Sequence, residues 1–189
     1  METLKEKIAR VIKEVVEIVD YDPEWIRLFQ KEKQHLLSCL PNNLIKTIEH
    51  FGSTAVPNLS AKPIVDILVE VTSLEATREQ IVPILEKQGY DYFWRPTLGD
   101  DIGPFYAWFI KRNSQGLRTH HLHMIEKDFE HWDSLLFRDY LIEKPYIAKE
   151  YQQLKLSLQK EYKNDRVAYT KAKGNFITRI TNDAKKYFG

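Results

Sequence analysis

The chain has 189 residues, and 28 Lys and Arg side chains balance 27 Asp and Glu for a net charge of +1. This balance excludes a general attraction to nucleic acid or to an anionic membrane, and 43% apolar residues are typical of a globular protein with its own core. No apolar stretch is long enough to span a membrane, and the charged N-terminus lacks an apolar signal segment, so we expect a cytoplasmic protein.

The first predicted elements are helical. Residues 3–14 form a charged amphipathic pattern, which we interpret as an N-terminal helical extension over residues 1–15. Residues 14–19, EVVEIV, favour a strand. Asp22 can then cap a helix, with Pro23 in its first turn, that runs to about Leu40.

The middle of the chain alternates between strand and helix patterns. Strands are predicted at 46–51 and 64–71, followed by a helix over 74–88 that Gly89 closes. Strands at 90–94 and 105–112 flank a polar loop. The turn at 113–116 then predicts a hairpin partner at 117–126.

Everything after about Phe129 has a helical period, in three helices over 129–144, 145–164 and 165–188. Strands early and helices late indicate an α+β fold in a single domain over 16–189. We expect a mixed β-sheet backed by helices over about 16–127 and a helical C-terminal layer over about 128–189. Strands 46–51 and 64–71 should be neighbours, with the 105–126 hairpin in the same sheet.

One carboxylate and two histidines are candidate metal ligands. Strand alternation puts Asp66 and Leu68 on one sheet face, and burying a carboxylate there is costly unless it is paired or bound to metal. Asp66 could instead cap the strand or bond to the preceding loop. In THHLHM, His121 and His123 share a face and could offer two imidazoles to a metal, although such pairs also occur as buried hydrogen-bonding residues.

Several cationic or aromatic residues could meet an anion. Lys62 lies in the loop before Asp66, and Tyr169 and Lys173 share a helix face at a spacing of four. The alternative is a solvated surface for these residues. For Arg138 the alternative is a local ion pair with Asp139.

Several motifs together resemble one family. The segments VDYDPEW, EHFGSTAVPNLSAKPIVDILVEV, RTHHLHMIE, LLFRDYLIEKP and YTKAKGNFI occur in the order and spacing of GrpB proteins, also known as UPF0157. The resemblance extends from about Val16 to Ile180 and implies the nucleotidyltransferase fold. It also implies that Arg138, together with Tyr169 or Lys173, points toward the Asp66 cleft.

The resemblance also implies roles for the residues of the quoted motif. Gly52 and Ser53 would hold nucleotide phosphates, and Asp66 would be the first carboxylate of the metal site. Leu68 stands where a second carboxylate is expected, and His121 and His123 would take its place.

The implied activity is metal-dependent nucleotidyl or phosphoryl transfer on a nucleotide or other phosphorylated small molecule. The implied cofactor is a divalent metal: zinc, manganese or magnesium. Two imidazoles and a carboxylate favour a transition metal over magnesium. The alternative is a non-catalytic nucleotide- or anion-binding module with a degenerate active site.

Overall fold

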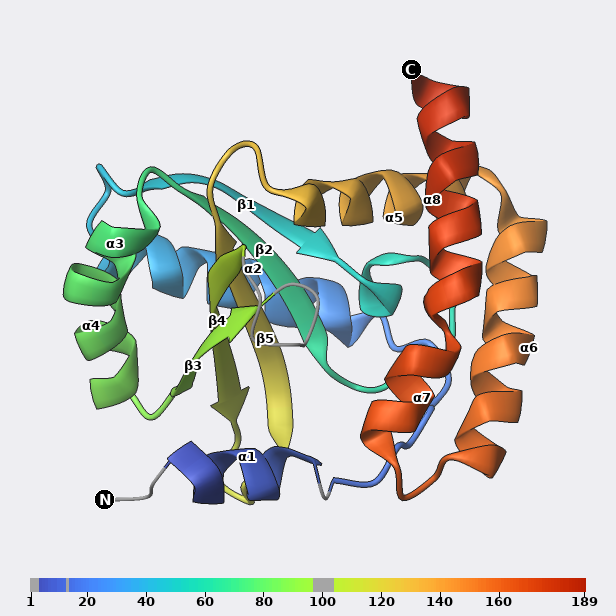
Figure 1. Cartoon of the computed structure of the whole chain (residues 1–189), viewed down its shortest axis with the longest axis horizontal. Coiled ribbons are helices and arrows are strands. Elements are labelled where there is room, and N and C mark those ends of the chain that lie inside the picture. The colour runs from blue at the N-terminus through green and yellow to red at the C-terminus, as the bar shows by residue number, and fades with distance from the viewer. Residues whose placement is uncertain (1–3, 13, 97–103) are drawn as a thin grey trace.

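A five-stranded mixed sheet forms the centre of the molecule (Figure 1), in a computed structural model that describes residues 4–12, 14–96 and 104–189. Its order is β1-β2-β5-β4-β3, with β1 Ile45–Phe51, β2 Val65–Val71, β3 Asp91–Pro96, β4 Phe105–Arg112 and β5 Arg118–Ile125. Strands β2 and β5 run parallel, and the other neighbouring pairs are antiparallel. The predicted mixed sheet is confirmed, with β1 beside β2 and the β4–β5 hairpin in the same sheet.

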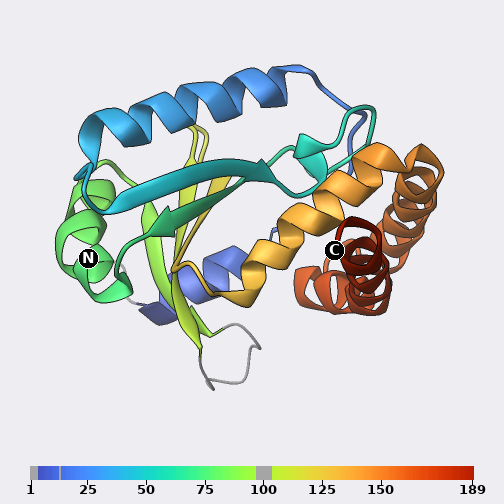
Figure 2. The same ribbon diagram turned by 90° about the horizontal axis from the view of Figure 1, so that it is seen from above.

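One face of the sheet carries the larger core. Alternate residues of β2 and β5 point to this face and pack against α2 (Glu24–Cys39) and α4 (Val82–Lys87). Figure 2 shows α2 running along this side of the sheet. The core residues contributed by these elements are Val65, Ile67, Val69, Val71, Leu122, Met124, Trp25, Phe29, Leu36, Val82 and Leu85.

The other face holds the candidate ligands of the sequence analysis. It packs against η3 (Glu130–Trp132), α5 (Asp133–Glu143) and α1 (Leu4–Ile12) through Trp132, Leu135 and Val11. Helices α6 (Pro145–Glu161), α7 (Arg166–Ala172) and α8 (Gly174–Phe188) lie together at one end of the sheet (Figure 1). Helices α6 and α8 enclose an apolar cluster with α5 and the loop after β1, and Tyr169 of α7 packs in a second cluster with Val16 and Leu158. The C-terminal part is therefore a helical layer, as expected.

Residues 14–19 do not form the expected strand. Their only ladder contact among the described residues is a single bridge between Val19 and Ala61. The amide of Val16 donates to the Lys163 carbonyl, and the amide of Ile18 donates to the Gln159 side chain. The backbone groups that a strand would use are therefore bonded to α6 and the turn after it.

Two long helix predictions are interrupted. The predicted helix over 74–88 is α3 (Leu74–Ala76), a π-turn η2 (Thr77–Ile81) and α4, because Pro83 supplies no N–H to a regular helical ladder. The predicted helix over 165–188 breaks between α7 and α8 at Lys173–Gly174, where glycine is a weak helix former.

Some of the sequence predictions fall on residues that the structure does not describe. The polar loop between β3 and β4 falls on 97–103, and positions 3 and 13 of the N-terminal helix also lie outside the described residues. Among the residues that the structure describes, no helix combines the length and apolar character needed to cross a bilayer.

Candidate functional site

The turn after β1 lies directly against the carboxylate of Asp66. Gly52 has φ 73° and ψ −171°, a conformation that is accessible almost only to glycine, and Ser53 begins a short 3₁₀ turn, η1 (Ser53–Ala55). A Cβ atom at Gly52 would stand 2.6 Å from Oδ2 of Asp66. Both the backbone angle and the available space therefore require glycine at this position.

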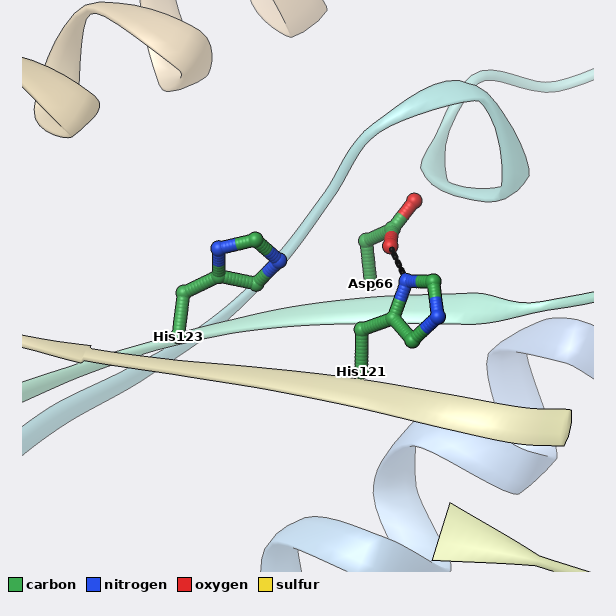
Figure 3. A group of neighbouring side chains, drawn as sticks. All are labelled: Asp66, His121 and His123. Atoms are coloured by element: carbon green, nitrogen blue, oxygen red, sulfur yellow. Dashed lines mark hydrogen bonds and ion pairs between the residues drawn. The ribbon is translucent and has the colours of Figure 1, made fainter. Parts of the chain in front are cut away.

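Asp66, His121 and His123 converge on one face of the sheet (Figure 3). The parallel register of β2 and β5 places Asp66 beside His121 and Leu68 beside His123. The Nδ1 atom of His121 lies 2.9 Å from Oδ1 of Asp66. Strand alternation had predicted that the two imidazoles share a face, and parallel pairing brings that face alongside the Asp66 carboxylate.

Burial and their mutual hydrogen bond determine the charge states of Asp66 and His121. Burial alone would raise the pKa of Asp66, but the hydrogen bond from His121 and electrostatic interactions with His121, His123 and Lys62 lower it to about 2. Burial lowers the pKa of His121 to about 4, against the opposing effect of Asp66. At neutral pH the site therefore contains a carboxylate that accepts a hydrogen bond from a neutral imidazole.

Aromatic rings fix the position of His123. Its ring stacks on Tyr106 at 5.5 Å between centroids and meets the edge of Phe51 at 5.1 Å. The ring of His131, from η3, lies 5.9 Å away. Burial holds the pKa of His123 well below its usual value, so this imidazole is also neutral and can act as a ligand.

A cavity of about 690 Å³ opens beside this cluster. Gly52, Ser53 and Asp66 form one wall, and residues of α5, α6, α7 and α8 form the opposite wall. Three lysines from separate segments of the chain also line it: Lys62, Lys155 and Lys173. The cavity therefore lies between the sheet and the helical C-terminal layer.

Two of these lysines flank a buried tyrosine. The Nζ atoms of Lys62 and Lys173 lie 5.5 Å and 4.6 Å from the ring centroid of Tyr169. Tyr169 is fully buried, and its hydroxyl has no hydrogen-bond partner among the described residues. Cation–π contact holds the two ammonium groups near each other beside an unused hydroxyl.

The three lysines have no carboxylate within ion-pair distance in the described part of the chain, whereas the fourth lysine of the cavity, Lys185, pairs with Asp133 at 2.5 Å. Burial and neighbouring positive charge lower the pKa of Lys155 to about 7 and that of Lys173 to about 8. An anion in the cavity would offset this repulsion, so the arrangement suits a negatively charged ligand.

Arg138 is not part of this cavity. Its guanidinium donates to the carbonyl of His50 at 2.6 Å and forms ion pairs with Glu49 at 3.3 Å and Asp139 at 2.7 Å. The expectation that Arg138 points into the Asp66 cleft is therefore corrected: it fastens α5 to β1. Tyr169 and Lys173 do line the cavity, as the resemblance implied.

Lys155 was missed from the sequence, although a signal was present. It follows the buried Tyr151 by four positions on α6, so it falls on the apolar stripe rather than on the solvated face. Its side chain is 2% exposed, and its Nζ donates to the carbonyl of Ser60. A lysine inside a helical apolar stripe is the pattern that could have revealed it.

The cluster fits a divalent metal ion. One ligand atom from each of Asp66, His121 and His123 lies within 4.8 Å of the other two. Two ligands of one zinc ion, each about 2.1 Å from it at the tetrahedral angle, are about 3.4 Å apart. Small side-chain rotations would bring the ligand atoms from within 4.8 Å of one another to about 3.4 Å. A carboxylate with two imidazoles suits zinc or manganese better than magnesium.

Fold and site together define a class: an α+β protein whose single mixed sheet presents a carboxylate and two imidazoles to a basic cavity. The chain belongs to the GrpB family, because the family model described as GrpB protein matches residues 15–183. The resemblance seen in the motifs is thereby confirmed at the level of the family.

Individual relatives agree with this assignment. The Glutamate-rich protein GrpB of Alkalihalophilus pseudofirmus is 37% identical over 167 residues, which are 88% of this chain and 94% of that protein. The UPF0157 protein YqkA of Bacillus subtilis is 36% identical over 93% of this chain, but the match spans only 49% of YqkA. The crystal structure of the conserved protein GrpB from Enterococcus faecalis is similar, with a TM-score of 0.77 and 36% identity, over 92% of this chain and all of that one.

Proposed function

We propose that the protein binds a nucleotide or another phosphorylated small molecule in the cavity beside Asp66, together with a divalent metal ion. The observation that supports this most directly is that three lysines line the same cavity as the Gly52–Ser53 turn and have no carboxylate partner among the residues that the structure describes. Burial lowers the pKa of each of these lysines, and a bound phosphate would stabilise the charged form of all three at once.

Each group has a distinct role in this proposal. The Ser53 hydroxyl and the amides of the turn hold phosphate oxygens, and Lys62, Lys155 and Lys173 offset their charge. Asp66, His121 and His123 would hold the metal, which supplies a Lewis acid for a phosphate oxygen when bound. Neutral imidazoles meet the need for deprotonated ligands without any change of pH.

The proposed reaction class is nucleotidyl or phosphoryl transfer on a nucleotidyltransferase-like fold. Its support is the order of parts along the chain: a Gly-Ser turn, then a strand that carries a carboxylate. The second carboxylate that the resemblance implies is replaced by Leu68, and His123 of the neighbouring strand stands directly beside that position. An imidazole of β5 would therefore occupy the place of the missing oxygen ligand.

The second candidate is a non-catalytic module that binds the same kind of anion. Leu68 is fully buried in an apolar cluster, so the strand offers one carboxylate where the transfer chemistry of the resemblance uses two. In this case the protein would bind a nucleotide without turning it over.

Calorimetric titration with inorganic pyrophosphate and with ATP tests the binding proposal. We expect Lys173→Met to weaken binding at least about tenfold, because it removes a charge-assisted contact. Lys160→Met, an exposed lysine of α6 outside the cavity, is the control and should bind as the unmodified protein does. Equal affinities for the two variants, or no binding of either anion, would reject the proposal.

Product analysis separates the two candidates. Transfer of a nucleotidyl group from ATP releases pyrophosphate, which ion chromatography detects after a reaction with Mn²⁺. Release that Asp66→Asn abolishes identifies an enzyme. Tight ATP binding with no release in the presence of candidate hydroxyl acceptors identifies the binding module.

A further inference from the structure

Three arginines gather on one carboxylate, that of Glu14, in the segment that follows α1. Nε of Arg118 lies 2.5 Å from Oε2 of Glu14, and Nη1 of Arg112 lies 2.8 Å from Oε1. Nη1 of Arg166 approaches Oε2 only to 3.9 Å, which is beyond hydrogen-bond distance. One negative charge therefore serves guanidinium groups from β4, β5 and α7.

Glu14 does not neutralise this cluster. Arg112 has a second carboxylate partner, Asp91, at 3.0 Å. Arg118 and Arg166 form ion pairs with Glu14 alone among the described residues. Burial and the charge of Arg166 lower the pKa of Arg118 to about 10, and burial also lowers the pKa of Arg166. The cluster thus holds more positive charge than the carboxylate offsets.

One buried donor of the cluster is also unsatisfied. Arg166 is only 9% exposed, and its Nη2 atom has no hydrogen-bond partner in the described part of the chain. The other donors of Arg118 are used, because Nη2 donates to the Val11 carbonyl and Nη1 lies 3.4 Å from Nε2 of His121. Leaving a buried N–H of a charged group unpaired is costly, so Arg166 needs a further acceptor.

Glu14 lies on the solvent side of the arginines. Its side chain is 27% exposed, whereas those of Arg118 and Arg166 are 2% and 10% exposed. The chain is anchored two residues later by Val16, which is buried and donates its amide to the Lys163 carbonyl. Rotation of the Glu14 side chain would therefore uncover both guanidinium groups without moving the backbone.

The cluster adjoins the lysine cavity. Arg166 precedes Tyr169 by three positions on α7, so the two side chains lie on one face of the helix. The Nζ atom of Lys62 lies 5.5 Å from the ring centroid of Tyr169. The charges of Arg166 and Arg118 add to burial in lowering the pKa of Lys62, so the arginines act on the cavity through this lysine.

We propose that Arg118 and Arg166 form a second anion subsite, which Glu14 occupies in the absence of ligand and which accepts a phosphate group when Glu14 turns away. A phosphate carries about 1.5 to 2 negative charges at neutral pH and three acceptor oxygens. Guanidinium groups bind such an anion in a bidentate manner. It would offset both arginines and supply the acceptor that Nη2 of Arg166 lacks, so Glu14 acts as an internal competitor for phosphate.

This subsite goes beyond the proposed function and requires no metal ion. The phosphate is either free inorganic phosphate or the far end of a phosphate chain whose other end lies among the lysines of the cavity. Both sources present the same chemistry to Arg118 and Arg166.

Calorimetric titration of inorganic phosphate into Glu14→Gln tests the subsite, because glutamine keeps the size of the side chain and removes its charge. We expect Glu14→Gln to bind phosphate at least about tenfold tighter than the unmodified protein. Combining it with Arg166→Met should abolish the gain, whereas combining it with Arg179→Met, an exposed arginine of α8, should preserve the gain. Glu17→Gln, an exposed glutamate of the same segment, should bind phosphate as the unmodified protein does.

Tripolyphosphate distinguishes the two sources of phosphate. If one chain spans both sites, Lys173→Met in the Glu14→Gln background should weaken tripolyphosphate binding at least about tenfold. If the arginines take free phosphate, tripolyphosphate should keep the affinity gained through Glu14→Gln when Lys173 is replaced.

Thermal unfolding serves if Glu14→Gln is too unstable to titrate. At an ionic strength matched with chloride, phosphate should raise the melting temperature of Glu14→Gln more than that of the unmodified protein, because a bound ligand stabilises the folded state. Equal affinities and equal shifts for the two proteins, or a gain that Arg166→Met leaves in place, would overturn the subsite. A gain in Glu14→Gln with no effect of Lys173→Met on any anion would contradict the lysine site and support the arginine subsite.

Discussion

At the scale of single residues, the site depends on a glycine that leaves room for a carboxylate. Gly52 has a positive φ and its Cα faces Oδ2 of Asp66 with no space for a side chain. The turn and the carboxylate thus constrain one another, and the Ser53 hydroxyl is carried to the cavity by that turn.

Gly52→Ala should lower the free energy of unfolding by about 3 kcal/mol, because an unfavourable backbone conformation adds to the steric contact with Asp66. Gly116→Ala is the matched control: Gly116 also has a positive φ, of 78°, but nothing lies within 4 Å of its added Cβ. We expect a loss of about 1 kcal/mol there. Urea unfolding measures both, and equal losses would show that contact with Asp66 contributes nothing.

The residues of the site were predictable only where local patterns decide. Strand alternation places His121 and His123 on one face, but the neighbour of that strand is set by long-range pairing. Lys155 and Arg138 each lie on a helix, and the sequence does not specify what that helix packs against. Lys155 turns into the cavity and Arg138 turns to β1.

At the scale of elements, a buried charge fastens α2 to the sheet. Glu32 is 2% exposed and accepts hydrogen bonds from the hydroxyl of Tyr90 and the ammonium of Lys111. These contacts lie on the face opposite the Asp66 cluster. They therefore contribute to the scaffold and not to the ligand site.

Glu32→Ala should destabilise the fold by about 2–3 kcal/mol, because it leaves Lys111 and Tyr90 without their buried acceptor. Glu24→Ala, on the same helix, breaks only an exposed pair with Arg27 and should cost no more than about 0.5 kcal/mol. Thermal or urea unfolding of the two variants compares them directly. A loss for Glu32→Ala as small as that for Glu24→Ala would contradict the assignment of a buried clamp.

The order of elements followed from sequence periodicity, but their continuity did not. Hydrophobic period and turn residues gave all five sheet strands and the helical C-terminal layer. The segment 14–19 has the composition of a strand, yet α6 and the turn after it satisfy its amides. Tertiary contacts of this kind override local propensity and leave no mark in the local sequence.

At the scale of the whole molecule, buried neutral histidines make stability depend on pH. Burial lowers the pKa of His50, His121 and His131 to about 4 each, whereas an unfolded histidine titrates near about 6.5. Between these values the unfolded chain binds more protons, so stability falls as the pH falls. Asp66, with a pKa of about 2, loses its contribution only below this window, as the pH falls from its ordinary 3.8.

We therefore expect the metal-free protein to lose unfolding free energy between pH 6.5 and pH 4, by about 2–3 kcal/mol for each of these three imidazoles. Urea unfolding at a series of pH values measures this loss. Stability that stays constant across the window would show that the three imidazoles are not held neutral by burial.

The central claim is that Asp66, with two imidazoles, holds a divalent metal beside the basic cavity, and calorimetric titration of Zn²⁺ and Mn²⁺ into metal-free protein tests it most directly. We predict one ion per chain for the unmodified protein and at least about tenfold weaker binding for Asp66→Ala. Glu70→Ala is the control, since Glu70 lies on the same face of β2 but bonds to Thr47 outside the cluster, and it should bind as the unmodified protein does. No metal bound by the unmodified protein, or equal affinities for Asp66→Ala and Glu70→Ala, would contradict the account.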